Sequence, residues 1–227
     1  MSARSASILE GLRRVLLAPD PAVAPALRGP AKAAVLVPLY IRDDQLHVVL
    51  TRRRDDLRRH PGEMSFPGGR WEQGDHDLRA TALREAHEEI GLQPAAIEIV
   101  GALRPTATIT TGYRIHPFVA VIEPPRAWAL SASEVAAVIE LPLPGLRAAY
   151  ARRVLIGRGL PVATDTYLAG EQLIWGATAR ILTDLFGRIA PAAAPPSESA
   201  ATPAHAWAQP FSIGTSTRFP HSVHDPS

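Results

Sequence analysis

The stretch that decides the fold is SFPGGRWEQGDHDLRATALREAHEEIGL, which runs from Ser65 to Leu92. Its second half, read as an α-helix at about 100° per residue, has two distinct faces. One face carries three carboxylates, which are Glu85, Glu88 and Glu89. The opposite face is apolar and consists of Leu83, Ala86 and Ile90. Like charges three and four residues apart destabilise a helix, so the acidic face requires a counter-charge. Because carboxylate oxygens are ligands of hard cations, the pattern predicts a Mg²⁺ or Mn²⁺ site.

Local signals around this segment support a helix that forms part of a site. Asp75 and Asp77 stand at its expected start, where carboxylates cap backbone amides and complement the helix dipole. Gly91 stands at its expected end, where glycine is favoured. A Phe-Pro-Gly-Gly turn comes shortly before the helix. An isolated acidic run is more often a solvated surface, but this context favours the metal site.

The run ALREAHEEIGL, preceded by FPGGRWEQGD, resembles the Nudix hydrolase family. The box of that family is a glycine, an acidic residue, then Arg-Glu, Glu-Glu and Gly along a loop-helix-loop. This chain departs from the general box in two respects. The spacing from Gly69 to Arg84 is one residue longer, and Asp75 stands where the general box has a glutamate. The longer form, together with the residues before it, resembles one subgroup, the coenzyme A diphosphatases.

The loop from Thr51 to Gly69 is rich in arginine, with Arg52, Arg53, Arg54, Arg58 and Arg59. Such a loop is often only a solvated surface. Placed directly before an acidic helix it can instead neutralise phosphates, because guanidinium groups bind phosphate oxygens in pairs. The loop also resembles the signature of the subgroup at Leu50, Thr51, Arg53, Arg58, Gly62 and Phe66 to Gly69. Arg54 stands where that signature usually has a small residue.

Composition limits the classes of function. The chain has 227 residues, a formal net charge of +2 and one lysine, Lys32, so its overall charge does not indicate a nucleic-acid partner. The lack of cysteine excludes disulfides, thiol catalysis and cysteine-ligated zinc. No apolar run reaches the roughly 18–20 residues of a membrane span. Glu10 interrupts the N-terminal apolar residues, which argues against a signal peptide. We therefore expect a cytoplasmic protein with no membrane partner.

Three regions are expected along the chain. Residues 1–32 combine a proline-broken connector with a short amphipathic helix, whose apolar residues are Ile8, Leu12, Val15 and Leu16. Residues 33–189 are the part that resembles the Nudix family and are expected to form one domain. Residues 190–227 are rich in Ala, Pro, Ser and Thr, and we expect a disordered tail.

Apolar patterns within residues 33–189 predict strands interleaved with two helices. The expected elements are a hairpin of 33–41 with 46–51, strands at 97–103 and 115–122, a helical start followed by a strand over 131–143, a hairpin at 168–173, and an amphipathic helix at 176–188. Residues 146–156 mix arginine with apolar residues and indicate no particular element. His116 is expected to be structural. Trp175 is expected to lie in the core, with stacking on the substrate as the alternative.

The resemblance implies an α/β/α sandwich with a mixed sheet and a loop-helix-loop metal site. Glu85 and Glu89, one turn apart on the same face, are expected to be the main ligands of Mg²⁺ or Mn²⁺. Glu88 is expected to be a further ligand or the group that orients or deprotonates the attacking water. By analogy with the family, Arg84 holds a carboxylate in place.

Substrate contacts are expected from the loops around this helix. Gly68 and Gly69 allow a close backbone turn, and Arg53 and Arg58 suit phosphates. Of the loop Thr110, Thr111, Gly112 and Tyr113, we expect Thr111 and Tyr113 to contact ligand, with a hydrogen-bonded turn as the alternative. Glu134 stands where the family often has a further acidic group, so it is a candidate for a general base or a contact of the metal.

The resemblance implies hydrolysis of the diphosphate of coenzyme A or acyl-coenzyme A, which gives 3′,5′-ADP and 4′-phosphopantetheine or its acyl derivative. One alternative is a Nudix hydrolase for another nucleotide such as ADP-ribose or NADH. Another is a nucleotide-binding sensor without turnover. The expected partner is thus a small nucleotide rather than nucleic acid. The sequence leaves open the preferred acyl group and whether the chain forms a homodimer.

Overall fold

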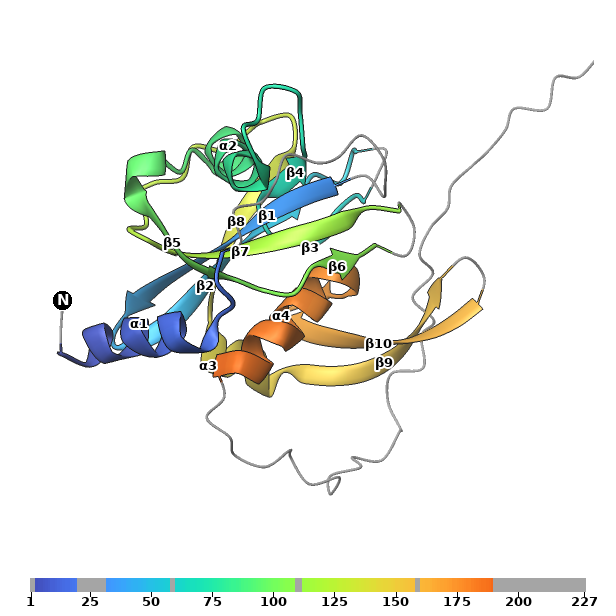
Figure 1. Ribbon diagram of the computed structural model, residues 1–227. Coiled ribbons are helices and arrows are strands. Elements are labelled where there is room, and N and C mark those ends of the chain that lie inside the picture. Colours follow the sequence, from blue (N-terminus) through green and yellow to red (C-terminus); the bar gives the residue numbers. More distant parts are fainter. Residues whose placement is uncertain (1–2, 20–31, 58–59, 109–111, 158–159, 190–227) are drawn as a thin grey trace, which may run out of the picture.

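The computed structural model describes residues 3–19, 32–57, 60–108, 112–157 and 160–189 (Figure 1). Arg58, Arg59, Thr110, Thr111 and the predicted tail lie outside the described residues. The helices are α1 (Ala3–Val15), α2 (Leu78–Ile90), the short 3₁₀ helix η1 (Pro94–Ala96), α3 (Leu143–Ala148) and α4 (Gly176–Ile189). The strands are β1 (Lys32–Arg42), β2 (Gln45–Arg53), β3 (Met64–Ser65), β4 (Gly68–Arg70), β5 (Ile97–Ala102), β6 (Thr106–Ala107), β7 (Arg114–Ile122), β8 (Val135–Pro142), β9 (Tyr150–Gly157), β10 (Leu160–Ala169) and β11 (Gln172–Ile174).

The main sheet is mixed and is centred on β1. Its principal order is β3-β2-β1-β7-β5, with β4 paired to β1, β6 to β7 and β8 to β2. The β1–β2 hairpin is confirmed. Asp43 and Asp44 form its turn with φ values of 51° and 56°, the left-handed conformation that a two-residue hairpin turn favours. The parallel pairing of β1 with β7 makes the sheet mixed.

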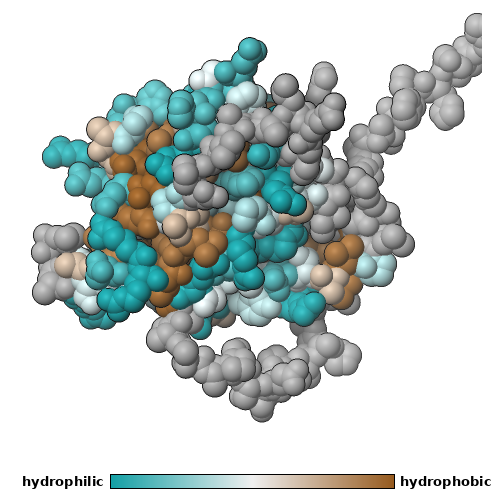
Figure 2. Space-filling view, in the orientation of Figure 1, coloured by the Kyte–Doolittle hydropathy of each residue, from teal (hydrophilic) through white to brown (hydrophobic). Residues whose placement is uncertain are grey.

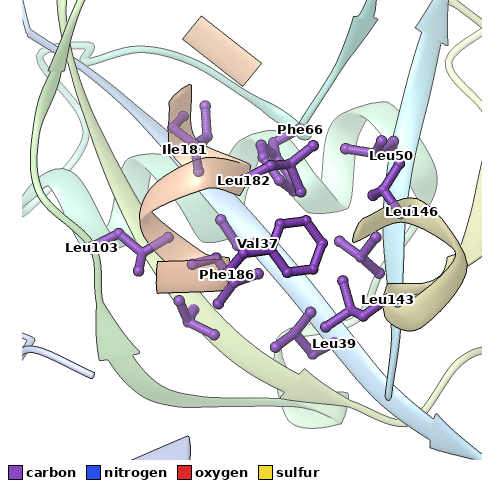
Figure 3. Packing of buried hydrophobic residues seen from close by; sticks show 14 of the residues in the cluster. Val37, Leu39, Leu50, Phe66, Leu103, Leu143, Leu146, Ile181, Leu182 and Phe186 are labelled. Atoms are coloured by element: carbon purple, nitrogen blue, oxygen red, sulfur yellow. The ribbon is translucent and has the colours of Figure 1, made fainter. Parts of the chain in front are cut away.

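Helices cover both faces of this sheet, which confirms the expected α/β/α sandwich (Figure 1). β1 is buried on both sides because its side chains alternate between two cores. Val37 and Leu39 join the core beneath α4, and Leu36 joins the core beneath α2. Figure 3 shows α4 contributing Ile181, Leu182 and Phe186 to the first core.

The region that showed no clear pattern forms an addition to this sandwich. Residues 143–157 fold as α3 and β9, and β9 pairs with β10 in a second sheet of order β11-β10-β9. The hairpin at 168–173 is confirmed by the pairing of β10 with β11, and the predicted helix at 176–188 is confirmed as α4. The helical start expected before β8 is wrong, because residues 132–134 form only a turn.

The N-terminal helix packs onto the same body as the sandwich. Leu9, Leu12 and Leu16 are buried against the core beneath α4, whereas Val15 is exposed. Leu17 exchanges backbone hydrogen bonds with Ala102 of β5, at 3.1 and 2.9 Å. The amphipathic helix is confirmed, and its buried stripe includes Leu9 in place of Val15.

Apolar side chains gather on the surface between α1 and α2, over β5 and β7 (Figure 2). A cavity of about 410 Å³ lies here, with Leu17, Leu103 and Phe118 among its lining residues. Within the described part of the chain, no helix is long and apolar enough to cross a membrane.

Candidate active site

Helix α2 is fixed at both ends by the residues that the sequence indicated. The Asp77 carboxylate accepts a hydrogen bond from the Ala80 amide at 2.8 Å and caps the N-terminus. Gly91 ends the helix with φ of 71°, and its amide donates to the His87 carbonyl at 2.9 Å. The apolar face is buried against the sheet through Leu78, Ala82, Ala86 and Ile90. The acidic face consequently points away from the core beneath α2.

The three carboxylates of this face differ in exposure. Glu89 is 5% exposed, the Glu85 side chain is 15% exposed, and the Glu88 side chain is 56% exposed. Burial, helped by the negative charge of Glu85, raises the pKa of Glu89 to about 8. Burial also raises the pKa of Glu85. Glu134 adds to both increases through its charge, so its carboxylate lies within electrostatic range of this pair.

Two glycines bring the preceding loop directly against these carboxylates. A Cβ on Gly69 would overlap the Glu85 carboxylate, and a Cβ on Gly68 would overlap the backbone of Ala34 and Val35. The Gly68 amide donates a hydrogen bond to Glu89, which opposes the rise in the pKa of that carboxyl. Only glycine fits this close approach of β4 to β1 and α2.

Arg84 links the acidic face to the loop before the helix. Its Nε and Nη2 donate to the two carboxylate oxygens of Asp75, at 2.9 and 3.0 Å. Its Nη1 donates to Glu85 at 3.0 Å and to Glu88 at 3.1 Å. The Arg84 guanidinium lowers the pKa of Asp75 to about 2. Asp75 therefore anchors Arg84, and the cap of the helix is Asp77 alone.

The donor chemistry of this face fits a hard divalent cation. Among the described residues, no three His, Asp or Glu side chains are grouped closely enough to hold an ion by themselves. Magnesium usually takes only one or two carboxylates and completes its coordination with substrate phosphates and water. Glu85 and Glu89 fit this requirement, because Glu89 is buried, Glu85 is partly buried and the charge of Glu85 opposes ionisation of Glu89. A bound cation would relieve this repulsion.

A cavity of about 370 Å³ begins at the turn that contains Gly68 and Gly69, which we call the glycine loop. Arg53, Gly68, Gly69 and Tyr113 line it, so four of the six predicted substrate contacts share one cavity. Within the described part of the chain, the buried Nε of Arg53 has no hydrogen-bond partner. The guanidinium of Arg70 lies 4.9 Å from the centre of the Tyr113 ring. The other two predicted contacts, Arg58 and Thr111, fall outside the described residues.

Helix α4 and the residue before it supply a wall of this cavity that the sequence did not assign to the site. Thr178 and Arg180 of α4 line the cavity, and so does Trp175, which directly precedes the helix. Trp175 is only partly buried, so its placement in the core is wrong. The signal available in the sequence was the run IWGATARIL, from Ile174 to Leu182, which resembles the corresponding run in the coenzyme A diphosphatases. Nothing in that run itself linked it to Gly68 and Gly69. His116, partly buried with a pKa lowered by burial, lines the other cavity and not this one.

Comparison with known proteins matches this chain to one family. A model described as the NUDIX domain matches residues 30–138. Uncharacterized Nudix hydrolases NudL from Salmonella paratyphi B and Salmonella enteritidis are 38% identical over 165 residues, which cover 68% of this chain and 80% of each relative.

Solved structures of the same family are more distant. A MutT/nudix family protein from Enterococcus faecalis is 19% identical with a TM-score of 0.49, over 73% of this chain and 64% of that protein. The NUDIX domain of Shewanella oneidensis NrtR, complexed with ADP ribose, is 22% identical with a TM-score of 0.44, over 54% of this chain and 79% of that one. The identity to the curated relatives and the length over which it extends show that this chain belongs to the Nudix hydrolase family, as a hydrolase acting on pyrophosphate bonds.

Proposed function

We propose that this enzyme hydrolyses the diphosphate of coenzyme A or an acyl-coenzyme A, with Mg²⁺ or Mn²⁺, in the cytoplasm. The products would be 3′,5′-ADP and 4′-phosphopantetheine or its acyl derivative. One observation carries the proposal most directly. The loop that resembles the coenzyme A diphosphatase signature places Arg53, Gly68 and Gly69 in one cavity, and Gly69 lies against the Glu85 carboxylate. The phosphate-binding residues and the acidic face thus adjoin.

The acidic face would hold the metal through Glu85 and Glu89, with Glu88 and Glu134 as further acidic groups. The ion would neutralise the anionic oxygens of the diphosphate and lower the pKa of a bound water. Arg84 positions Glu85, since its guanidinium is itself held by Asp75 through two hydrogen bonds. Glu88 is the most exposed of the three glutamates and is therefore the one best placed to orient or deprotonate water.

The arginine loop would bind the phosphates of the substrate. Arg53 lines the cavity, where its guanidinium would pair with the phosphate oxygens. Its positive charge also stabilises the ionised form of Glu89. Arg58 is proposed to join it on the basis of the resemblance, and Thr111 on the basis of its place in the Thr-rich loop before Tyr113. Tyr113 lines the cavity beside Arg70 and would contact the organic part of the nucleotide.

A comparison of substrates tests this proposal. Purified protein with Mg²⁺ or Mn²⁺ is incubated with coenzyme A, acetyl-coenzyme A, ADP-ribose and NADH, and the products are separated by chromatography. We expect 3′,5′-ADP to form faster from the coenzyme A compounds than the other two substrates are cleaved. Faster cleavage of ADP-ribose or NADH would contradict the proposed substrate and leave the family chemistry in place. Binding without cleavage of any compound would favour the sensor.

A further inference from the structure

The cavity beside Gly68 and Gly69 is lined by more arginines than binding of the cleaved diphosphate requires. Three arginines, Arg53, Arg70 and Arg180, line it together with one acidic residue, Glu63. The Glu63 carboxylate already contacts the His60 ring at 2.8 Å. Among the described residues, none of these arginines has a carboxylate within the 4.0 Å of an ion pair, in contrast to Arg84 or Arg104. A cavity with this excess of cations suits a ligand with several negative charges.

Arg180 is the cavity arginine whose environment most needs explanation. It lies on the first turns of α4 and is partly buried. Its single hydrogen bond among the described residues is donated by Nη2 to the Ala107 carbonyl at 2.6 Å. Burial lowers the pKa of its guanidinium, and Asp165 offsets this only through longer-range attraction. The Asp165 carboxylate itself accepts hydrogen bonds from Tyr150 and Thr183.

The pairing of the strands shows that the guanidinium of Arg180 lies far from the acidic face of α2. Arg70 of β4 pairs with Ala33, Ala33 pairs with Ile115, and Ile115 pairs with Thr106 of β6. Three strand spacings of about 4.8 Å separate the first strand from the last, or roughly 14 Å. Gly69 lies beside Glu85 at the β4 end of this row, and Arg180 contacts Ala107 at the β6 end. A diphosphate held by Glu85 and Arg53 therefore leaves Arg180 for another group.

We propose that Arg180 binds a second anionic group of the substrate, separate from the diphosphate that is cleaved, and so determines specificity. The inference rests on the proposed function for the identity of the substrate. Two groups of a coenzyme A compound have the required chemistry, which are the 3′-phosphate of the ribose and a carboxylate at the end of an acyl chain. Either group would accept two hydrogen bonds from the guanidinium of Arg180. Among the described residues, this partly buried guanidinium donates only to the Ala107 carbonyl.

Substrate pairs that differ by one anion test this assignment. Coenzyme A is compared with 3′-dephospho-coenzyme A, and succinyl-coenzyme A with acetyl-coenzyme A, by kcat/KM for the wild type and Arg180→Gln. We expect the wild type to prefer the anionic member of one pair by about tenfold to a hundredfold, the range of a hydrogen bond to a charged group. Arg180→Gln should abolish this preference, mainly through a higher KM. The pair that responds identifies the anion.

Two further variants separate recognition from structure. Arg180→Lys keeps the charge without the paired geometry and should retain part of the preference. Arg188→Gln removes another arginine of α4, one that pairs with Asp184, and should leave both substrate ratios unchanged. An equal loss of kcat/KM for all four substrates in Arg180→Gln would show that Arg180 only connects α4 to β6 through its hydrogen bond to Ala107. That result, or a wild type with no preference in either pair, would overturn the inference.

Failure of the proposed function gives a different result. In that case the wild type cleaves none of the four coenzyme A compounds and does cleave NADH. The inference is then tested on NADPH and NADH, which differ by a 2′-phosphate. A wild-type preference for NADPH that Arg180→Gln abolishes would support a second anion site, and equal rates on both would overturn it.

Discussion

At the scale of single residues, Arg84 and Asp75 form the ion pair that holds the acidic face in shape. Two hydrogen bonds join a side chain that is 25% exposed to one that is 5% exposed. Asp75→Asn removes one of these charges and should lower the free energy of unfolding at pH 7 by about 1.5–3 kcal/mol, as for other hydrogen bonds to charged groups.

The pH dependence of this loss has a definite sign. The folded pKa of Asp75, about 2, lies below its unfolded value. The charge of Asp75 therefore stabilises the fold above roughly pH 4, and this contribution is lost as the pH falls through about 2. Urea unfolding of wild type and Asp75→Asn, without metal, should show a difference that narrows between these pH values. An equal difference at pH 7 and pH 2.5 would contradict the role of the ion pair.

Gly69 is the other residue whose identity the site requires. A Cβ at this position would overlap the carboxylate of Glu85, which Arg84 holds in place. Gly69→Ala should therefore reduce turnover by about tenfold or more, the effect expected when a positioned group is displaced. Gly74→Ala is the matched control, since a Cβ at Gly74 meets nothing within 4 Å. Equal activities of the two variants would show that the close approach is not needed.

At the scale of secondary structure, α4 contributes both to the hydrophobic core and to the cavity beside Gly68 and Gly69. Leu182 is fully buried in the core beneath it (Figure 3). Arg180 of the same helix lines the cavity. Leu182→Ala should lower the free energy of unfolding by about 2–5 kcal/mol. Gly187→Ala on the same helix should be neutral or stabilise by up to about 1 kcal/mol, because glycine disfavours helix and the site is open. Urea denaturation measures both, and a smaller loss for Leu182→Ala would argue against this packing.

The elements differ in how far sequence alone could predict them. The β1–β2 hairpin and α2 have short, regular apolar patterns with turn or cap residues at their ends, so local chemistry specifies them. β9 gave no such signal, because Arg152, Arg153 and Val154 are all exposed and no alternation marks a buried face. Its structure comes from pairing with β10, which a local pattern does not encode.

At the scale of the whole molecule, the site is assembled from segments of unequal predictability. Gly68, Gly69, Glu85 and Glu89 lie within one stretch of sequence, so a single motif indicated that they act together. Arg180 follows Glu85 by 95 positions, and tertiary packing alone brings α4 to the same cavity. Sequence could therefore indicate the acidic face and the turn of Gly68 and Gly69 beside it, whereas the contribution of α4 to the cavity required the fold.

Metal binding should be visible as stabilisation of the whole molecule. A ligand that binds only the folded state raises the melting temperature with concentration, and a cation would also relieve the repulsion between Glu85 and Glu89. We expect Mg²⁺ or Mn²⁺ to raise the Tm of the wild type and of the control variant Glu123→Gln. Glu123 is an exposed residue that directly follows β7. The double variant Glu85→Gln/Glu89→Gln should show no such rise. A similar rise in the double variant would place the metal elsewhere.

The most direct test of the account measures metal-dependent turnover of coenzyme A by Glu85→Gln and Glu89→Gln. Both substitutions preserve side-chain size and remove one charge from the acidic face of α2. We expect each to retain the fold, judged by circular dichroism and Tm, and to lose turnover by about a hundredfold or more, since the metal supplies several kcal/mol to the transition state. Metal-dependent turnover retained by both variants would contradict the assignment of Glu85 and Glu89 as the metal ligands.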